Sequence, residues 1–295
     1  MYDIILKMIM GTIMEKQFLE KLLNKDILKI EEIRNKDGIS VVRIICDKNN
    51  YVLKYFENLD YAREIGIYKL LKKLKIRTLL IKQFGPNYIL MEDVNASKDL
   101  RLAVQDDLND DMVLKNLAEW YKTLHEKGKE IDLNDFYCEY DLINKKSLKS
   151  LSNILSEGTV QFLIDNIETI YNLKNNLKYT LTYNDFAPEN LIVGKNCAFM
   201  YDYNFVGKGY AFEDLQNVLA MLTPNKQKVF LKYYGTIKQT KKEKGIQKIL
   251  TSLSTLILAN KRKEFPSWGT RSLNYVKSKE FKNNIISYTT YKQIQ

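Results

Sequence analysis

The chain has 295 residues, of which 45% are hydrophobic and 28% charged, and its formal net charge at pH 7 is +10. This balance is typical of a soluble globular protein with one large domain or two, and it excludes a largely disordered chain. The three cysteines, Cys46, Cys138 and Cys197, are odd in number and far apart in the sequence. They argue against a disulfide framework or a cysteine metal site and favour a reducing compartment.

The first apolar stretch, Ile4–Ile13, is interrupted by Lys7 and is too short to span a bilayer. No basic region precedes it, so we expect no signal peptide, no membrane span and a cytoplasmic location. A helix is predicted over Glu15–Asn24. Its packing face would comprise Phe18, Leu19, Leu22 and Leu23.

A mostly antiparallel sheet is predicted from Ile27 to Met91. The apolar runs Ile30–Ile33 and Val41–Ile45 flank a turn at Asn35–Ser40 that contains a single glycine, Gly38. This turn is a candidate cover for phosphate groups, although it lacks a full glycine-rich motif.

The next predicted strand carries one lysine. Tyr51–Phe56 alternates and is rich in β-branched and aromatic residues, and Lys54 lies within it. Ten residues later, Glu64 lies in Tyr61–Leu74, where apolar residues recur at helical spacing. A strand lysine paired with a glutamate on the following helix is the arrangement by which kinases hold the α- and β-phosphates of ATP. Alone, Lys54 would be interpreted as a solvated charge at a strand edge.

Helices dominate the predicted remainder of the chain. Asp110–Lys127 has one continuous apolar face and ends near His125, the only histidine. We favour a structural role for His125, because it adjoins Leu124 at the end of an apolar helix and no nucleophile motif accompanies it. Further helices are predicted at residues 145–156, 158–176, 211–222, 225–234 and 243–260.

The most informative segment is Tyr183–Val193. It contains Asp185 and Asn190, and Asp202 follows twelve residues after Asn190. The apolar runs Leu191–Val193 and Ala198–Tyr201 predict a hairpin that turns at Gly194–Asn196, which would bring Asn190 and Asp202 to one end. Their oxygen atoms suit Mg²⁺, and Asp185 could accept a proton from a hydroxyl that attacks a phosphate.

Together these residues resemble the aminoglycoside phosphotransferase and choline kinase-type family. The resemblance spans about residues 30 to 220 and rests on Lys54, Glu64, Tyr88–Val94, Leu124–His125, Asp185, Asn190, Asp202 and Asp214. It implies an α+β, two-lobed, protein-kinase-like fold. Residues 1–91 would form a small nucleotide-binding lobe with an antiparallel sheet and a helix, 92–96 a linker, and 97–295 a larger, mainly helical lobe.

The resemblance also implies roles for single residues. Lys54 would grip the α- and β-phosphates of ATP or GTP, Glu64 would orient it, and Asp214 would be a buried structural acid. Asp185 would be the catalytic base, and Asn190 and Asp202 would bind Mg²⁺. The nucleotide base would meet the linker at Met91, Glu92 and Val94, above the apolar Ile192. Two positions depart from the family pattern: Tyr183 replaces a histidine and Asn204 replaces an acid.

Positive charge is concentrated near the C-terminus. Residues 224–295 hold 16 of the 46 lysines and arginines but only 3 of the 36 acidic residues. This region could bind nucleic acid, an anionic membrane face or a phosphorylated substrate, but we favour a solvated lysine-rich surface. We interpret Trp268, Tyr275, Tyr288 and Tyr291 as packing residues rather than base-stacking platforms.

The sequence therefore predicts a Mg²⁺-dependent transfer of the γ-phosphate of ATP or GTP to a hydroxyl of a small molecule. The basic C-terminal quarter argues mildly against an aminoglycoside acceptor. Asp106, Asp107, Asp110 and Asp111 could attract a polycation but are also explained as helix-capping charges. Two alternatives remain: a non-catalytic nucleotide-binding relative, and a protein- or nucleic-acid-associated role for the basic region.

Overall fold

A computed structural model describes residues 13–236 and 238–290. The described chain forms two compact units, each built from several stretches of sequence. Unit 1 contains residues 13–127, 185–206 and 218–235, and unit 2 contains 128–184, 207–217 and the described residues from 236 onward. The lobe boundary predicted at residues 92–96 stays a prediction; this segment lies inside unit 1.

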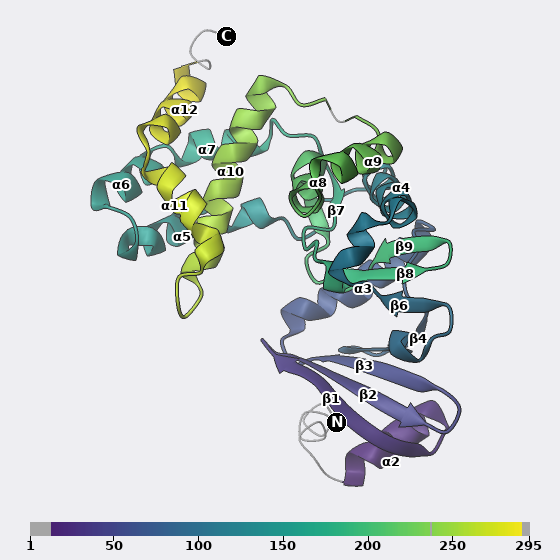
Figure 1. The fold of residues 1–295 in the computed structure, drawn as a ribbon. Coiled ribbons are helices and arrows are strands. Elements are labelled where there is room, and N and C mark those ends of the chain that lie inside the picture. The colour runs from purple at the N-terminus through teal and green to yellow at the C-terminus, as the bar shows by residue number, and fades with distance from the viewer. Residues whose placement is uncertain (1–12, 237, 291–295) are drawn as a thin grey trace. The chain divides into compact units, whose positions relative to one another are not determined.

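Unit 1 combines a five-stranded sheet, a three-stranded sheet and flanking helices (Figure 1). Its elements are α2 (Ile13–Leu23), β1 (Ile27–Lys36), β2 (Ile39–Cys46), β3 (Asn50–Phe56), α3 (Arg63–Lys73), β4 (Ile81–Phe84), β5 (Tyr88–Glu92), β6 (Leu100–Leu102), α4 (Asp111–Gly128), β8 (Leu191–Gly194), β9 (Cys197–Met200) and α9 (Pro224–Tyr234).

The larger sheet is antiparallel with the strand order β1-β2-β3-β5-β4. Side chains alternate between its two faces. On one face, Leu53 and Leu90 pack in a core with Leu19 of α2. Lys54 lies at the next position of β3 and therefore belongs to the opposite face, opposite Val41 of β2 and Ile89 of β5. Helix α2 thus covers one side of the sheet and leaves the Lys54 side for other contacts.

The β1–β2 hairpin turns on two residues, Asp37 and Gly38, with φ of 58° and 76°. Two successive left-handed residues match the twist of a tight hairpin, and Asp-Gly is a favoured pair for them. The Gly38 carbonyl accepts the backbone N–H groups of Glu57 and Asn58. The turn is therefore anchored to the end of β3.

The smaller sheet, β6-β8-β9, contains the predicted hairpin. Leu191 pairs with Met200 and Gly194 with Cys197, so Lys195 and Asn196 form the loop. Nearby in unit 1, His125 of α4 is 1% exposed, and its Nδ1 lies 2.8 Å from the Tyr234 hydroxyl. This buried contact supports the structural role predicted for His125.

Unit 2 is mainly helical. It contains α5 (Lys145–Lys149), α6 (Glu157–Asp165), α7 (Ile167–Lys174), the strand pair β7 (Tyr179–Thr182) and β10 (Gly207–Tyr210), most of α8 (Ala211–Ala220), α10 (Lys241–Asn260), α11 (Thr270–Lys277) and α12 (Lys279–Thr290). Residues of α10 such as Leu250 and Leu253 are fully buried at the centre of its core. Helices α7, α11 and α12 pack against α10 (Figure 1).

The sequence predictions agree with the structure in most of these elements. All three cysteines are free and buried. Two predicted helices are wrong in extent. Residues 158–176 form α6 and α7, separated at Asn166, and 145–156 form the short α5 followed by a 3₁₀ turn over Ser150–Asn153.

Two predictions concern segments near the chain ends. No helix in the described part of the chain is long and apolar enough to cross a membrane. Residues 4–12 and Tyr291 lie outside the described residues, so what the sequence predicts for them stays a prediction. Trp268, predicted to pack, is instead 52% exposed, because it sits on a short turn between α10 and α11. Tyr275 and Tyr288 do pack against the core.

Candidate active site

A buried lysine joins two acids that are distant in sequence. Lys54 Nζ lies 2.6 Å from Glu64 Oε2 on α3 and 2.7 Å from Asp202 Oδ1, just beyond β9. Lys54 is 6% exposed and Glu64 is fully buried. Burial by itself lowers the pKa of Lys54, but the charges of Glu64 and Asp202 more than offset this effect, so the pKa is raised. The lysine therefore stays protonated, as phosphate binding requires.

The backbone around Asp202 is held by Glu64 and Arg63. Asp202 has a φ of 61°, a left-handed conformation that is uncommon for a residue other than glycine. Glu64 Oε1 accepts the Tyr203 N–H at 3.1 Å, and Arg63 Nη2 donates to the Asn204 carbonyl at 2.6 Å. The start of α3 thus fixes both Lys54 and the segment that carries Asp202.

Asp185 and Asn190 lie together on the loop before β8. Asn190 Nδ2 donates to the Asp185 carbonyl at 3.1 Å and to Asp185 Oδ2 at 3.2 Å. The Tyr201 N–H donates to the Asn190 carbonyl at 3.0 Å, so the hairpin brings Asn190 next to the strand end before Asp202. Burial, and secondarily the charge of Asp202, raises the pKa of Asp185 to about 6. The negative charge of Asp202 therefore acts on the Asp185 carboxyl.

Within unit 2, Asp214 fixes the residues that precede Asp185 in the chain. Its two carboxylate oxygens accept the backbone N–H groups of Tyr183 at 2.7 Å and Asn184 at 2.8 Å. Asp214 and Tyr183 are both fully buried, and Asn184 has a φ of 66°. Asp214 is therefore a buried structural acid, as the resemblance implied, and Tyr183 occupies a packed position in the loop.

The donor set of unit 1 fits a divalent cation with oxygen ligands. Mg²⁺ is bound by one or two protein carboxylates together with water and substrate phosphates, rather than by a full protein cage. Asp202 supplies a carboxylate and Asn190 an amide oxygen, and the Asp185 carboxylate lies beside Asn190. Among the described residues, no group of three acids, histidines or cysteines that could hold a metal occurs.

Asn204 completes the surroundings of Asp202. Its amide nitrogen donates to Asp202 Oδ1. Its own oxygen, Oδ1, is buried and makes no hydrogen bond to the described residues. An acid at this position would instead face Asp202 with a second negative charge. The amide therefore relieves repulsion while it keeps an oxygen close to the proposed metal ligands.

Of the four residues predicted to meet the nucleotide base, only Met91 and Glu92 belong to the five-stranded sheet, where they lie on opposite faces. Met91 pairs with Val52 and shares the Lys54 face, whereas Glu92 pairs with Tyr51 on the α2 face. Met91 is 6% exposed, and Ile192 is buried at the centre of the β6-β8-β9 sheet. The contacts of Met91 and Ile192 with a nucleotide base stay a prediction.

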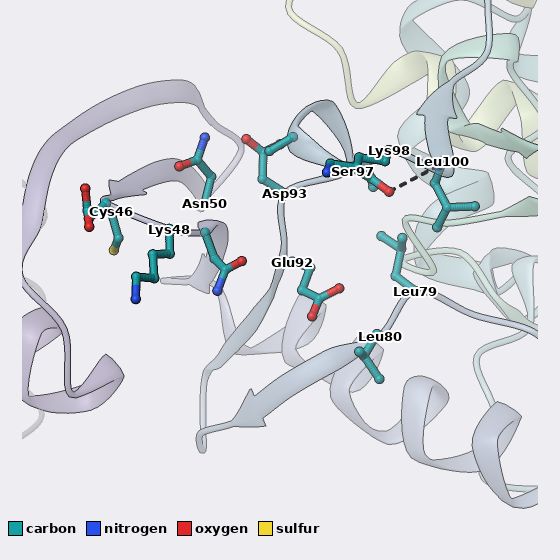
Figure 2. A pocket seen from close by; sticks show the side chains of 14 residues that line it. Cys46, Lys48, Asn50, Leu79, Leu80, Glu92, Asp93, Ser97, Lys98 and Leu100 are labelled. Carbon is teal, nitrogen blue, oxygen red and sulfur yellow. Dashed lines mark hydrogen bonds between the residues drawn. The ribbon is translucent and has the colours of Figure 1, made fainter.

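Glu92 and Val94 also line a separate pocket of about 530 Å³ in unit 1 (Figure 2). Its other walls come from the β2–β3 turn, the segment before β4 and residues 96–100. Figure 2 shows the Glu92 carboxylate pointing toward Leu79 and Leu80. Since Lys54 and Met91 do not line this pocket, it lies apart from the candidate site.

Arg34 is a residue of the site that was not predicted. It pairs with Val41, which pairs in turn with Lys54, so the three side chains share one face of three adjacent strands. Burial raises the pKa of Asp185 and of Tyr201, and the positive charge of Arg34 opposes part of this rise in each. A register shift lies between Glu32 and Arg34, a β-bulge that re-aims the strand beside the site.

The acidic cluster before α4 is engaged in local structure. Asp107 binds Arg101 through two bonds of 2.6 and 2.7 Å and accepts the Val104 N–H. Asp110 accepts the Met112 N–H at 2.7 Å. Asp111 pairs with Lys226 at 2.7 Å. These contacts support the capping explanation over a site for a polycation.

Comparison by sequence finds no matching family model and no matching curated protein. Solved structures do match. Choline kinase LicA from Streptococcus pneumoniae is 14% identical with a TM-score of 0.62, over 93% of this chain and 98% of that one. A putative fructosamine-3-kinase from Thermobifida fusca is 12% identical with a TM-score of 0.62, over 94% and 100%.

Spectinomycin phosphotransferase APH(9)-Ia, in complex with ADP and spectinomycin, is 15% identical with a TM-score of 0.53, over 92% and 98%. LicA also has a structure in complex with AMP. At these identities the similarity is one of fold. The chain therefore has the α+β, protein-kinase-like fold of these small-molecule kinases, and the fold class predicted from its sequence is confirmed.

Proposed function

We propose that this protein transfers the γ-phosphate of ATP, or of GTP, to a hydroxyl group of a small molecule. The observation that carries the proposal is the Lys54 ammonium held between Glu64 and Asp202, in the same unit as the Asp185–Asn190 pair. These five residues come from β3, α3, the loop before β8 and the segment after β9. They supply one ammonium group, three carboxyl groups and one amide. The fold shared with small-molecule kinases supports the same reaction class.

The proposed roles follow from charge and position. Lys54, oriented by Glu64, would neutralise the α- and β-phosphates, and Arg34 on the same face of the sheet would add a second positive charge. Asp202 and Asn190 would hold Mg²⁺, which when bound would neutralise charge on the phosphates. Met91, Val94 and Ile192 would contact the nucleotide base, with a backbone contact from Glu92.

Asp185 would orient the acceptor hydroxyl and accept its proton as the new P–O bond forms and the bond to the β–γ bridging oxygen breaks. Asn190 restrains the Asp185 carboxylate through the bond to Oδ2, so the base is positioned before the acceptor binds. Most of the catalytic effect would come from this positioning and from charge neutralisation, because phosphoryl transfer needs little covalent chemistry from the protein.

For the acceptor we propose a neutral or anionic hydroxylated metabolite rather than a polycationic aminoglycoside. Three of the four acids that could have attracted a polycation are engaged by Arg101, Lys226 and a helix terminus. Residues 224–295 carry a large excess of positive charge. We further propose a cytoplasmic location, where ATP is supplied.

The test is a transfer assay with Mg²⁺-ATP and Mg²⁺-GTP against sugars, polyols, amino alcohols, hydroxy acids and kanamycin-type aminoglycosides, followed by ³¹P NMR. We expect a phosphate monoester with at least one neutral or anionic acceptor, and none with the Asp185→Ala variant. Saturable phosphorylation of a kanamycin-type sugar would overturn the acceptor class. Nucleotide binding with no transfer to any acceptor would favour the non-catalytic alternative.

A further inference from the structure

Unit 2 carries an exposed aromatic side chain in a strongly basic setting, at the connection between α10 and α11. Trp268 is 52% exposed and Phe265 is 37% exposed. Lys261, Arg262 and Lys263 precede them, Arg271 follows, and all four are exposed. Figure 1 shows this connection projecting from the end of α10. Glu264 is the one acid between residues 260 and 271.

Helix α5 adds further positive charge beside this connection. Asn260 Nδ2 donates to the Ser150 carbonyl at 2.9 Å, which joins the end of α10 to the residue that follows Lys149. Lys145, Lys146 and Lys149 of α5 are all exposed. We call the set of Lys145, Lys146, Lys149, Lys261, Arg262, Lys263, Arg271, Phe265 and Trp268 the basic-aromatic surface. None of its cations forms an ion pair within the described residues.

The aromatic side chains are presented on a packed base. Gly269 is buried, and a Cβ there would meet the Phe265 ring at 2.8 Å and Ala259 at 2.9 Å. The 3₁₀ helix Ser267–Gly269 is thereby held against the end of α10, with Trp268 facing outward. An exposed tryptophan on a fixed turn has no role in the core of unit 2. It is available to an external partner.

From this combination we infer that the basic-aromatic surface docks on the headgroup region of an anionic lipid bilayer. Tryptophan prefers the membrane–water interface, where its ring is partly buried and its N–H stays hydrated. Each lysine or arginine near a negatively charged leaflet contributes about 1 kcal/mol, so several together can hold a protein reversibly. The site would thus recognise lipid phosphate through its cations and the acyl boundary through Trp268.

The same features fit nucleic acid less well. Binding of single strands uses successive aromatic platforms along a basic groove. Here Phe265 covers Gly269 and is only partly exposed, so Trp268 alone could stack on a base. The surface therefore offers one wedge surrounded by cations, which is the arrangement expected for an interfacial contact. This inference is independent of the phosphotransfer reaction.

Vesicle flotation at about 0.1 M salt tests the inference, with phosphatidylcholine vesicles that contain or lack phosphatidylglycerol. We expect binding to the anionic vesicles only. The triple variant Lys261→Ser, Arg262→Ser, Lys263→Ser should weaken it on the order of a hundredfold, since each cation contributes roughly fivefold. The matched control is Lys241→Ser, Lys242→Ser, Lys244→Ser. These lysines lie at the other end of the 20-residue α10, about 30 Å away.

Tryptophan emission supplies a second readout. The chain has two tryptophans, and Trp120 is buried with its Nε1–H bound to the Arg77 carbonyl at 2.9 Å. A blue shift on addition of anionic vesicles should therefore report Trp268 and disappear in Trp268→Phe. The inference is overturned if anionic vesicles do not bind, if the control triple variant weakens binding equally, or if the emission is unchanged. It is also overturned if the same cations bind mixed oligonucleotides but not vesicles.

Discussion

At the scale of single residues, the candidate site depends on side chains that fix one another before any substrate arrives. Glu64 binds Lys54 with one oxygen and the Tyr203 N–H with the other, so one buried carboxylate orients both the lysine and the Asp202 segment. Asn190 does the same for Asp185. Such restraint is what a reaction based on positioning and charge neutralisation requires.

Replacement of Asp185 separates catalysis from nucleotide binding. Asp185→Ala should lower kcat by roughly 10²- to 10⁴-fold, the usual contribution of a general base. The affinity for Mg²⁺-ATP should change little, because Lys54 and Asp202 remain. Steady-state kinetics and calorimetric titration of ATP measure the two effects. A variant that keeps most of its activity would show that Asp185 is not the base.

Replacement of Arg34 should affect the binding of ATP and of AMP differently. If Arg34 faces the phosphates beside Lys54, Arg34→Gln should weaken ATP binding about tenfold and AMP binding much less, because AMP lacks the outer phosphates. Lys48→Gln, on the exposed β2–β3 turn, is the matched control and should affect neither. Equal losses for ATP and AMP would place Arg34 outside the phosphate site.

At the scale of elements, local patterns in the sequence predicted the structure where periodicity was strong. The β8–β9 hairpin, strand β3 and the amphipathic α4 each have apolar residues at the spacing of their element, and each is found where expected. Because Leu191 of β8 pairs with Met200 of β9, the hairpin places Asn190 next to Tyr201, the residue before Asp202. This proximity could be predicted from the spacing of the two apolar runs.

Other elements have no such local signal. Strand β10 has the sequence Gly-Lys-Gly-Tyr, which has no apolar alternation. Gly207 allows close packing, since a Cβ there would lie 2.1 Å from the Tyr137 carbonyl oxygen. The pairing of β10 with β7 is a tertiary effect. Arg34 was missed because the predicted strand ended at Ile33, whereas β1 continues to Lys36 and the Asp37-Gly38 turn fixes the pairing of Arg34 with Val41. Trp268 was misjudged because composition does not reveal which aromatic residue a turn exposes.

The Asp37-Gly38 turn leads to a prediction of stability. Gly38→Ala should destabilise unit 1 by about 1–2 kcal/mol, because φ is 76° and the new Cβ would lie 2.8 Å from Asn58 Cβ. Gly66→Ala is the matched control: it lies in α3 with no atom within 4 Å, and it should stabilise by about 0.5–1 kcal/mol. Urea denaturation compares them. Two variants with the same sign of effect would contradict this account.

At the scale of the whole molecule, function and stability rest on different charged groups. The proposed phosphate site would use Lys54, Asp185 and Asp202 of unit 1, whereas unit 2 buries a separate polar cluster around Glu213. Glu213 accepts hydrogen bonds from the hydroxyls of Tyr140 and Thr251. Burial raises its pKa to about 7. This acid has no role in the proposed reaction and instead ties stability to pH.

The sign of that dependence can be predicted. With a folded-state pKa of about 7 and an unfolded value near 4.5, the folded protein binds more protons between these values. The contribution of Glu213 to the free energy of unfolding should therefore fall by up to roughly 3 kcal/mol as the pH rises from about 4.5 to about 7. Glu213→Gln should flatten the curve in this window. Chemical denaturation at several pH values measures the free energy of unfolding of both proteins. If its slope against pH is the same in Glu213→Gln as in the natural protein, Glu213 does not titrate between about pH 4.5 and 7.

The most direct test of the central claim is the melting temperature with ATP or GTP, each with and without Mg²⁺, for the natural protein and for Asp202→Ala. A ligand bound only by the folded state must raise the melting temperature. We predict a Mg²⁺-dependent rise of several degrees for at least one nucleotide, which Asp202→Ala abolishes while Asp185→Ala retains it. No shift with either nucleotide, or an equal shift in Asp202→Ala, would contradict the assignment of this site to phosphoryl transfer.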